Sequence, residues 1–246
     1  METIIITGAL GGIGRGLIEH FALKGRNVII NYNNEEKAIK YKKRLDDKCS
    51  MEKILFLKAD VSKYDEVEEM FKAAAEKFGQ IDCLINCASI NKDAYIKDMD
   101  GDMWQDVINV NLTGTFNCSK LYAQQYKGQT GCIINLSSGT AVNGRAKGAN
   151  YCSSKAGVIN LTKDFAIEYA PNIRVNCIGL GMIMTDEIYH RYNLEDSQNL
   201  EDINKSIPLG YIGGVSDVVE MADFLIFKGR YITGQLIYVN GGMFMH

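Results

Sequence analysis

Short apolar runs alternate along this chain with longer segments in which apolar residues recur at helical spacing. The short runs are rich in β-branched residues and bounded by turn residues, so they are expected to be strands. They occupy 3–7, 28–30, 54–57, 81–85, 132–136, 173–178 and 236–239. Helical periodicity covers 15–23, 35–48, 64–78, 104–126, 151–170 and 218–227. The pattern therefore predicts strands and helices that alternate throughout.

The expected strands are apolar on both faces, which is typical of a parallel sheet covered by helices on each side. We predict an α/β fold, a Rossmann-type doubly wound parallel sheet of about seven strands. No linker, repeat or low-complexity tract interrupts it, so 1–246 is expected to be a single dinucleotide-binding and catalytic domain. The stretch 182–210 is polar, acidic and without apolar periodicity. We expect a substrate lid there, with an ordinary surface loop as the alternative.

Composition narrows the classes of partner. The formal net charge is −3 and no block of basic residues occurs, which argues against nucleic acid or an anionic membrane. No apolar run approaches the roughly 20 residues of a membrane span, and the first residues lack a signal segment. The 7 cysteines lie mostly in apolar runs, which favours free thiols in a reducing cytoplasm. Cys83 and Cys87 have no second pair or nearby histidine, so no metal site is expected.

Three glycines, Gly8, Gly12 and Gly14, lie between the first expected strand and the first expected helix. Glycines allow a backbone to approach a pyrophosphate closely, and a helix N-terminus presents free N–H groups to it. Chance alone can place glycines in this way, but their position directly after the first strand favours a dinucleotide site.

One tyrosine, Tyr151, is followed four residues later by a lysine, Lys155, and Ser138 precedes both just after a strand. Residues four apart share one face of a helix. A phenol is a weak acid unless its phenolate is stabilised, and an adjacent ammonium lowers its pKa. The three side chains therefore suit proton transfer to a ketone oxygen, although Ser138 alone could simply shape a turn.

The glycine spacing and the tyrosine–lysine pair resemble those of the short-chain dehydrogenase/reductase family, whose motifs match in order along the whole chain. Cys87 and Ser89 depart from the family's turn after the fourth strand, and Leu180 replaces its proline after the sixth. The resemblance implies the catalytic residues Ser138, Tyr151, Lys155 and Asn111, with Asn111 anchoring a water. It implies as cofactor-binding residues Gly8, Leu10, Gly12, Ile13, Gly14, Asn31, Asp60, Val61, Asn86, Ala88, Tyr151, Lys155, Gly181, Ile183 and Thr185.

Family members that prefer NAD have an aspartate at the end of the second strand, whereas this chain has Asn31 followed by Tyr32 and two asparagines. Without that aspartate a 2′-phosphate is not repelled. Lys37 is the nearest cation, and Gly11 stands where NADP-preferring members often carry arginine. We therefore favour NADP(H) as the cofactor, and NAD(H) stays possible.

The resemblance is to bacterial 3-oxoacyl-carrier-protein reductases and related ketone reductases, so the expected substrate is a small ketone, an alcohol or an acyl thioester. The acidic lid, with Gln129 and Asn172 where such reductases tend to carry arginine, argues against docking of an acidic carrier protein. A non-catalytic nucleotide-binding regulator on the same fold is an alternative. A sugar-nucleotide epimerase is disfavoured because the chain has no room for its larger substrate domain.

The C-terminal end of the chain predicts self-association. Its apolar residues would be exposed on a lone edge strand, and such edges are normally covered. They are Leu236, Tyr238, Phe244 and Met245. We expect a homotetramer, with a monomer that folds these residues onto its own core as the alternative.

Overall fold

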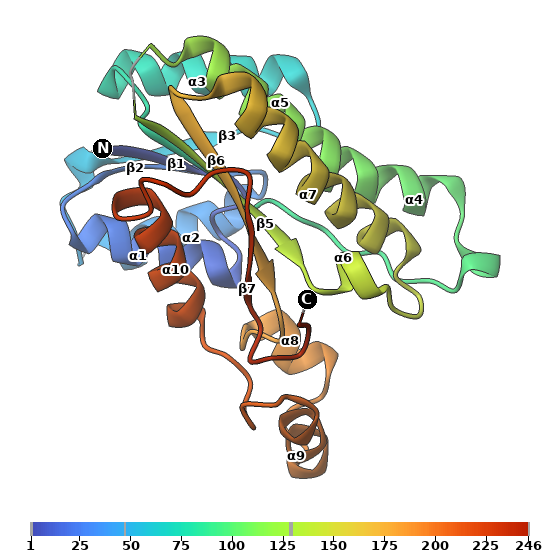
Figure 1. Cartoon of the computed structure of the whole chain (residues 1–246). Coiled ribbons are helices and arrows are strands. Elements are labelled where there is room, and N and C mark those ends of the chain that lie inside the picture. The colour runs from blue at the N-terminus through green and yellow to red at the C-terminus, as the bar shows by residue number, and fades with distance from the viewer. Residues whose placement is uncertain (1, 47, 128–129, 246) are drawn as a thin grey trace.

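Parallel strands form one sheet in the computed structural model, which describes residues 2–46, 48–127 and 130–245. The strand order is β3-β2-β1-β4-β5-β6-β7 (Figure 1). The bounds are β1 (Thr3–Ile6), β2 (Asn27–Tyr32), β3 (Ile54–Lys58), β4 (Cys83–Asn86), β5 (Gly131–Ser138), β6 (Ile173–Leu180) and β7 (Leu236–Val239). The predicted doubly wound parallel sheet is confirmed.

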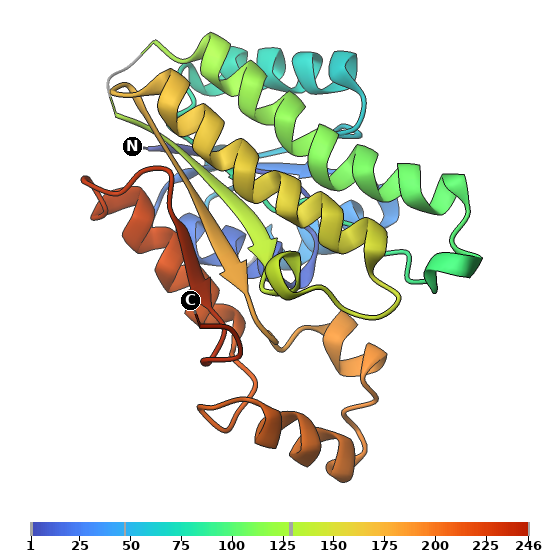
Figure 2. The ribbon, with the colours of Figure 1, turned by 45° about the vertical axis from the view of Figure 1, so that its right-hand side comes forward.

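The helices cover both faces of this sheet. They are α1 (Gly12–Leu23), α2 (Glu35–Asp46), α3 (Tyr64–Phe78), α4 (Gly101–Ile108), α5 (Gly114–Gln125), α6 (Thr140–Asn143), α7 (Ala149–Tyr169), α8 (Asp186–Arg191), α9 (Ser197–Ser206) and α10 (Val215–Phe227), with short helical turns η1 (Met51–Lys53), η2 (Ile96–Asp98) and η3 (Asn109–Thr113). Figures 1 and 2 show α3, α5 and α7 on one face and α1, α2 and α10 on the other.

Side chains of β1 show why both faces are covered. Ile4 and Ile6 belong to the core beneath α1 and α10, whereas Ile5 belongs to the core beneath α3 and α5. All three are fully buried, because successive side chains of a strand point to opposite faces. An uninterrupted apolar run is therefore the sequence signature of a strand in the middle of this sheet.

The strand order reverses beside β1, which pairs with β2 on one side and β4 on the other. Ligands bind in such sheets outside the carboxyl ends of the strands at this switch point. Here the turns after β1 and β4 are joined by the Thr7 hydroxyl, which accepts hydrogen bonds from the backbone N–H groups of Cys87 (3.1 Å) and Ala88 (3.2 Å). The two turns thus form one rigid edge.

The segment 182–210, for which the sequence analysis expects a lid and names no helix, contains α8 and α9. Thr185 caps α8 by accepting from the N–H of Ile188, and Asp196 caps α9 by accepting from the N–H of Gln198. Helix α8 is too short to show apolar periodicity. In α9 the apolar residues Leu200 and Ile203 are three apart on one face, and together with the cap residues they were the available signal. Figure 2 shows the two helices projecting from the body of the molecule as an arm.

The predicted helix at 104–126 begins earlier, at Gly101, and widens into the π-helical turn η3 between α4 and α5. No helix in the described part of the chain has the length and apolar character that crossing a bilayer requires.

Candidate active site

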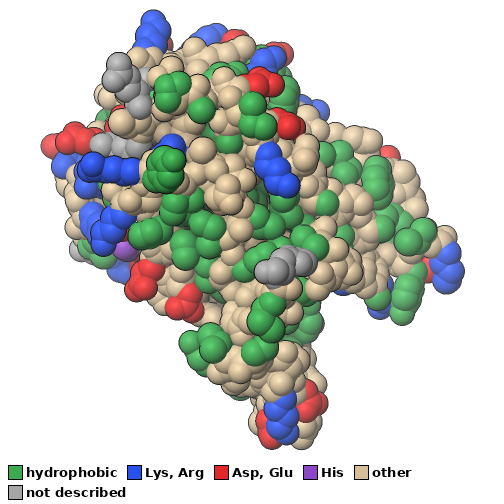
Figure 3. Space-filling model, in the orientation of Figure 1, with side chains coloured by type: hydrophobic (Ala, Val, Ile, Leu, Met, Phe, Trp, Pro, Cys, Tyr) green, Lys and Arg blue, Asp and Glu red, His purple; other side chains and the backbone are tan. Residues whose placement is uncertain are grey.

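A cavity of about 470 Å³ opens at the carboxyl ends of the strands. Figure 3 shows the surface hollowed between the arm of α8 and α9 and the lobe that carries α4. All but three of the predicted site residues line the cavity. Those lining it are Gly8, Leu10, Gly12, Ile13, Asn31, Asp60, Val61, Ala88, Ser138, Tyr151, Lys155, Gly181, Ile183 and Thr185. The cavity thus joins the glycine turn to the tyrosine–lysine pair.

The glycine turn is shaped by close packing. Gly8 has φ +56°, and a Cβ there would lie 2.5 Å from the Cα of Ala88. A Cβ at Gly12 would lie 2.7 Å from the Thr185 side chain. No side chain caps α1, whose N-cap is Gly11, so its first N–H groups can meet an anion. This arrangement fits the pyrophosphate of a dinucleotide.

The end of the cavity near β2 and β3 is fixed by two polar side chains. Asn31 donates to the carbonyl of Ala59 (3.0 Å) and accepts from the N–H of Gly8 (3.2 Å), which ties the glycine turn to β3. Asp60 accepts from the N–H (2.9 Å) and the hydroxyl (2.7 Å) of Ser62. Its carboxylate is thereby held at the cavity wall, where an adenosine moiety would bind.

Tyr151 and Lys155 project from α7 at the opposite end. The Lys155 ammonium donates to the carbonyl of Leu136 (2.9 Å) and lies 5.8 Å from the centre of the Tyr151 ring. The Ser138 hydroxyl lies 3.0 Å from that of Thr140 and accepts from the Thr140 N–H (3.3 Å). Three of the four predicted catalytic side chains therefore meet where β5 ends.

Burial dominates the protonation equilibria of this pair. It raises the pKa of Tyr151 to about 12, opposed most strongly by the positive charge of Arg145 and further by a hydrogen bond from Ser138. Burial also lowers the pKa of Lys155 to about 8. The sequence predicts that Lys155 lowers the pKa of the phenol, but in the structure the largest lowering contribution comes from Arg145.

Asn111, Asn86 and Gly14 do not line the cavity. The Asn111 side chain lies in η3, donates to the carbonyl of Ile90 (3.0 Å) and accepts from its N–H (2.8 Å), which holds the loop after β4. Asn86 donates to Ser119 (2.9 Å) inside the protein. These two side chains position the walls of the site.

Gly14 likewise faces the protein interior. A Cβ at this position would overlap the backbone of Ala9, so the glycine allows α1 to pack against the turn that follows β1. Close packing of helix and strand, rather than access for a phosphate, is the physical reason for the third glycine.

Several cavity residues were missed because no motif contains them. Asp93 forms ion pairs with Arg145 (2.6 Å) and Arg191 (2.8 Å), and both arginines line the cavity. The C-terminal Met243 and Phe244 also line it. The Phe244 ring packs against Gly139 of the same chain, where a Cβ would overlap it, and the side chain is half-buried.

Among the described residues, no group of three or more histidine, cysteine, aspartate or glutamate side chains is placed to hold a metal ion. The uncapped helix, the glycine cradle and the length of the cavity instead suit a nicotinamide dinucleotide. Fold and site together define the class of NAD(P)-dependent oxidoreductases that act on a ketone or secondary alcohol.

Comparison with known proteins makes this class more specific. The family model described as "Enoyl-(Acyl carrier protein) reductase" matches residues 8–244. The chain belongs to the short-chain dehydrogenase/reductase family. It is 38% identical to the 3-oxoacyl-[acyl-carrier-protein] reductase FabG of Staphylococcus epidermidis over 99% of each chain. It is 37% identical to the FabG of Chlamydia muridarum over 98% of this chain and 97% of that protein.

Solved structures agree. A glucose/ribitol dehydrogenase from Brucella melitensis superposes with a TM-score of 0.91 at 30% identity, covering 100% of this chain and 97% of that one. A gluconate 5-dehydrogenase from Burkholderia cenocepacia, in complex with NADP and tartrate, gives 0.87 at 28% identity over 98% and 94%. The protein is therefore an NAD(P)-dependent oxidoreductase.

Proposed function

We propose that this protein uses NADPH to reduce the ketone of a 3-oxoacyl thioester. The observation that carries the proposal is the single cavity that joins the glycine turn to Tyr151, Lys155 and Ser138. The relatives at 38% and 37% identity, which are named for 3-oxoacyl-carrier-protein reduction, support the thioester class. A catalytic set facing the nucleotide cradle favours an enzyme over a non-catalytic regulator.

Each side chain has a distinct role in this proposal. The bound nicotinamide supplies the hydride. The Tyr151 phenol gives its proton to the ketone oxygen, while the Ser138 hydroxyl donates a hydrogen bond to that oxygen as it gains negative charge. The Lys155 ammonium, held by the carbonyl of Leu136, reaches toward the nicotinamide ribose. Asn111 fixes the loop after β4 through its two hydrogen bonds to the backbone of Ile90.

The preference for NADPH rests on the cavity wall beside β2. Asn33, Asn34 and Lys37 line it there, and no acidic side chain between 31 and 37 does. Glu35, the first acidic residue after β2, lies beside Lys58 (3.9 Å) and contacts the Tyr32 hydroxyl (3.2 Å). The Lys37 ammonium would then bind the 2′-phosphate.

A second candidate is oxidation of a polar hydroxy acid. Arg145 and Arg191 line the cavity, and guanidinium groups are suited to binding carboxylates. The Burkholderia neighbour, a gluconate 5-dehydrogenase with bound tartrate, fits this class. The acidic lid also disfavours docking of an acidic carrier protein. Of the two positions where carrier-protein reductases tend to carry arginine, Asn172 is exposed and Gln129 lies outside the described residues.

We further propose a homotetramer that works in the cytoplasm. Figure 3 shows hydrophobic side chains gathered over β7 and the C-terminal segment. Met245 is 78% exposed and Leu209 63%. All seven cysteines are free thiols, which favours a reducing compartment. Light scattering at micromolar protein tests the assembly, and a mass near the 27.4 kDa of one chain would exclude it.

One experiment tests cofactor and substrate together. NADPH and NADH are titrated by fluorescence, and rates are then measured with acetoacetyl-coenzyme A and, in the oxidative direction, with D-gluconate and NADP⁺. The proposal expects tighter binding of NADPH and reduction of the thioester. Turnover of gluconate alone would favour the second candidate. Dinucleotide binding without any turnover would favour a regulator.

A further inference from the structure

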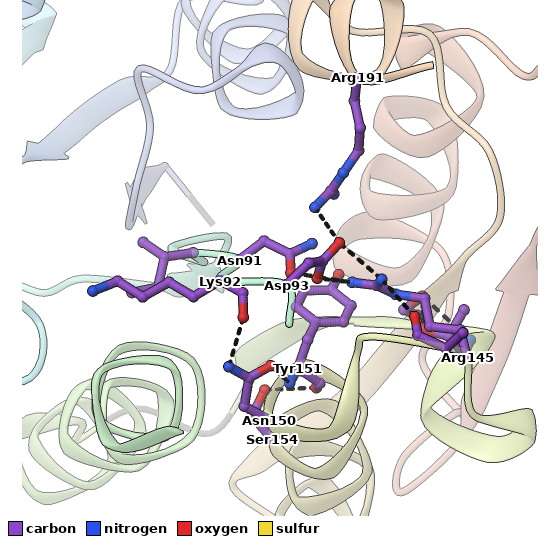
Figure 4. A network of polar contacts seen from close by, with 12 residues as sticks. Asn91, Lys92, Asp93, Arg145, Asn150, Tyr151, Ser154 and Arg191 are labelled. Atoms are coloured by element: carbon purple, nitrogen blue, oxygen red, sulfur yellow. Dashed lines mark hydrogen bonds and ion pairs between the residues drawn. The ribbon is translucent and has the colours of Figure 1, made fainter. Parts of the chain in front are cut away.

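Arg145, in the segment between α6 and α7, lies beside the phenol of Tyr151. Its guanidinium carbon is 5.5 Å from the centre of the Tyr151 ring, inside the range over which a cation interacts with an aromatic ring. Figure 4 shows the guanidinium and the ring side by side. Arg145 also lines the cavity, so its charge lies at the end where the proton would be exchanged.

The guanidinium is held in place by several partners. Its two terminal nitrogens donate to the two oxygens of Asp93, at 2.6 and 2.9 Å, and one donates also to the Asn91 side chain (3.1 Å). A planar guanidinium bound by two parallel hydrogen bonds has a defined orientation. The side chains of Arg145 and Asp93 are only 23% and 24% exposed. The cation is thus preorganised.

Asp93 does not cancel the positive charge of this cluster. It also accepts from Arg191 of α8 (2.8 Å), so one carboxylate is shared by two guanidinium groups (Figure 4). Asp93 is absent from the cavity wall, whereas both arginines are part of it. Arg191 also pairs with Glu187 (3.4 Å), which lines the cavity as well, so the positive charge that the cluster presents to the phenol is that of Arg145.

Other groups around the phenol come from three elements. Lys155 and Cys152 share α7 with Tyr151, Ser138 ends β5, and Glu187 and Arg191 approach from α8. Glu187 raises the pKa of Tyr151, but its side chain is 71% exposed and therefore well screened. Arg145 is the largest opposing charge.

We propose that Arg145, oriented by Asp93, is a positioning residue that stabilises the phenolate of Tyr151 and so sets the pH at which this tyrosine exchanges its proton. The inference rests on the proposed role of Tyr151 as the acid and base. Arg145 belongs to none of the motifs named in the sequence analysis.

Phenolate absorbance tests the inference without any substrate. Alkaline titrations with saturating NADP⁺ are recorded for the protein and its Tyr151→Phe variant, and their difference isolates Tyr151. The same pair is then compared in an Arg145→Met background. An opposite charge at this distance shifts a pKa by about one unit or more, so the midpoint should rise by about one pH unit. Arg145→Lys keeps the charge but loses the paired hydrogen bonds of the guanidinium to Asp93, so its midpoint should fall between those of the wild type and Arg145→Met.

Lys92→Met is the matched control. Lys92 carries its charge one residue from Asp93, but pairs with Asp106 (2.6 Å) and lies outside the cavity wall. Its removal should leave the Tyr151 midpoint unchanged. If alcohol oxidation is measurable, its pH–rate profile should move with the absorbance midpoint, because a merely structural role would lower the rate equally at every pH.

Two outcomes would overturn the inference: an unchanged midpoint in Arg145→Met, or a wild-type phenol that does not ionise before the protein unfolds in alkali. Circular dichroism establishes whether each variant is folded. If Arg145→Met does not fold, the midpoint of Arg145→Lys is compared with that of the wild type instead. Failure of the proposed function has a different signature: the wild-type protein would not reduce the thioester, or Tyr151→Phe would retain turnover, whatever the Arg145 variants do to the absorbance midpoint.

Discussion

The two ends of the cavity are built by different physical means. At the glycine turn, the geometry depends on residues without side chains, because a Cβ at Gly8 or Gly14 would overlap the backbone of a neighbouring segment. At the Tyr151 end, geometry is set by charged side chains from separate segments, with Asp93 shared by Arg145 and Arg191. The first end is specified by local spacing and the second by tertiary contacts. Variants of the two ends should therefore fail in different ways.

The largest expected effect is at the Tyr151 end of the cavity, and it concerns the rate of the reaction and not the binding of the nucleotide. Tyr151→Phe should lower kcat about 10²–10⁴-fold, the usual worth of a positioned acid or base, and leave the dissociation constant of NADPH nearly unchanged. The measurement is ketone reduction by stopped-flow together with fluorescence titration. Tyr95→Phe, an exposed tyrosine outside the cavity wall, is the matched control and should keep full activity. A Tyr151→Phe protein with more than about a tenth of the wild-type rate would contradict the assignment.

At the glycine end the expected effect is on stability. Gly14→Ala places a methyl group against the Ala9 backbone, and such overpacking costs about 1–3 kcal/mol of the free energy of unfolding. Dinucleotide affinity should fall with it, because the turn must shift. Urea unfolding measures the loss. Gly101→Ala is the control, since a Cβ there meets nothing within 4 Å. Equal stability of the two variants would refute the packing role of Gly14.

The same contrast explains which parts of the site could be predicted from the sequence. The run at 3–7 and the spacing of Gly8, Gly12 and Gly14 predicted a strand, a turn and a nucleotide site, because all of their constraints are local. The ion pairs of Asp93 could not be predicted, since its partners lie 52 and 98 residues away and belong to no motif.

Two other features were hidden for related reasons. Helix α8 is too short for periodicity to reveal it, and in α9 only Leu200 and Ile203 show the helical spacing. The position of Phe244 depends on Gly139, a contact between segments far apart in the chain. Asn111 was placed correctly on its helix, yet the π-helical turn that directs its amide toward Ile90 has no sequence signal that we recognise.

A smaller effect should separate the two nucleotides. Lys37→Met should weaken NADPH binding about tenfold, since one charge-assisted contact to the 2′-phosphate is lost at an exposed site. NADH binding should change little. Lys40→Met, on the same helix but outside the cavity wall, is the matched control. Fluorescence titration of both nucleotides measures the effect, and equal losses for NADPH and NADH would show that Lys37 does not read the phosphate.

The smallest predicted effect links the catalytic lysine to stability. Burial lowers the pKa of Lys155 from 10.5 to about 8, so below about pH 8 the folded protein holds a buried ammonium that the unfolded chain leaves in water. The unfolded state therefore binds more protons between these two values, and this group's contribution to stability rises with pH across that window. Lys155→Met removes the free-energy cost of burying this ammonium group. Despite losing the hydrogen bond to Leu136, it should be more stable at neutral pH by about 1 kcal/mol.

Urea unfolding measures this gain at neutral pH and again near pH 10, where it should largely disappear because Lys155 is then mostly neutral in the folded state. Lys163→Met, an exposed lysine on the same helix α7, is the control and should show no such gain. If Lys155→Met is less stable than wild type at neutral pH, the hydrogen bond to Leu136 outweighs the cost of burying the charge. Lys155 would then stabilise the Tyr151 end of the cavity instead of straining it.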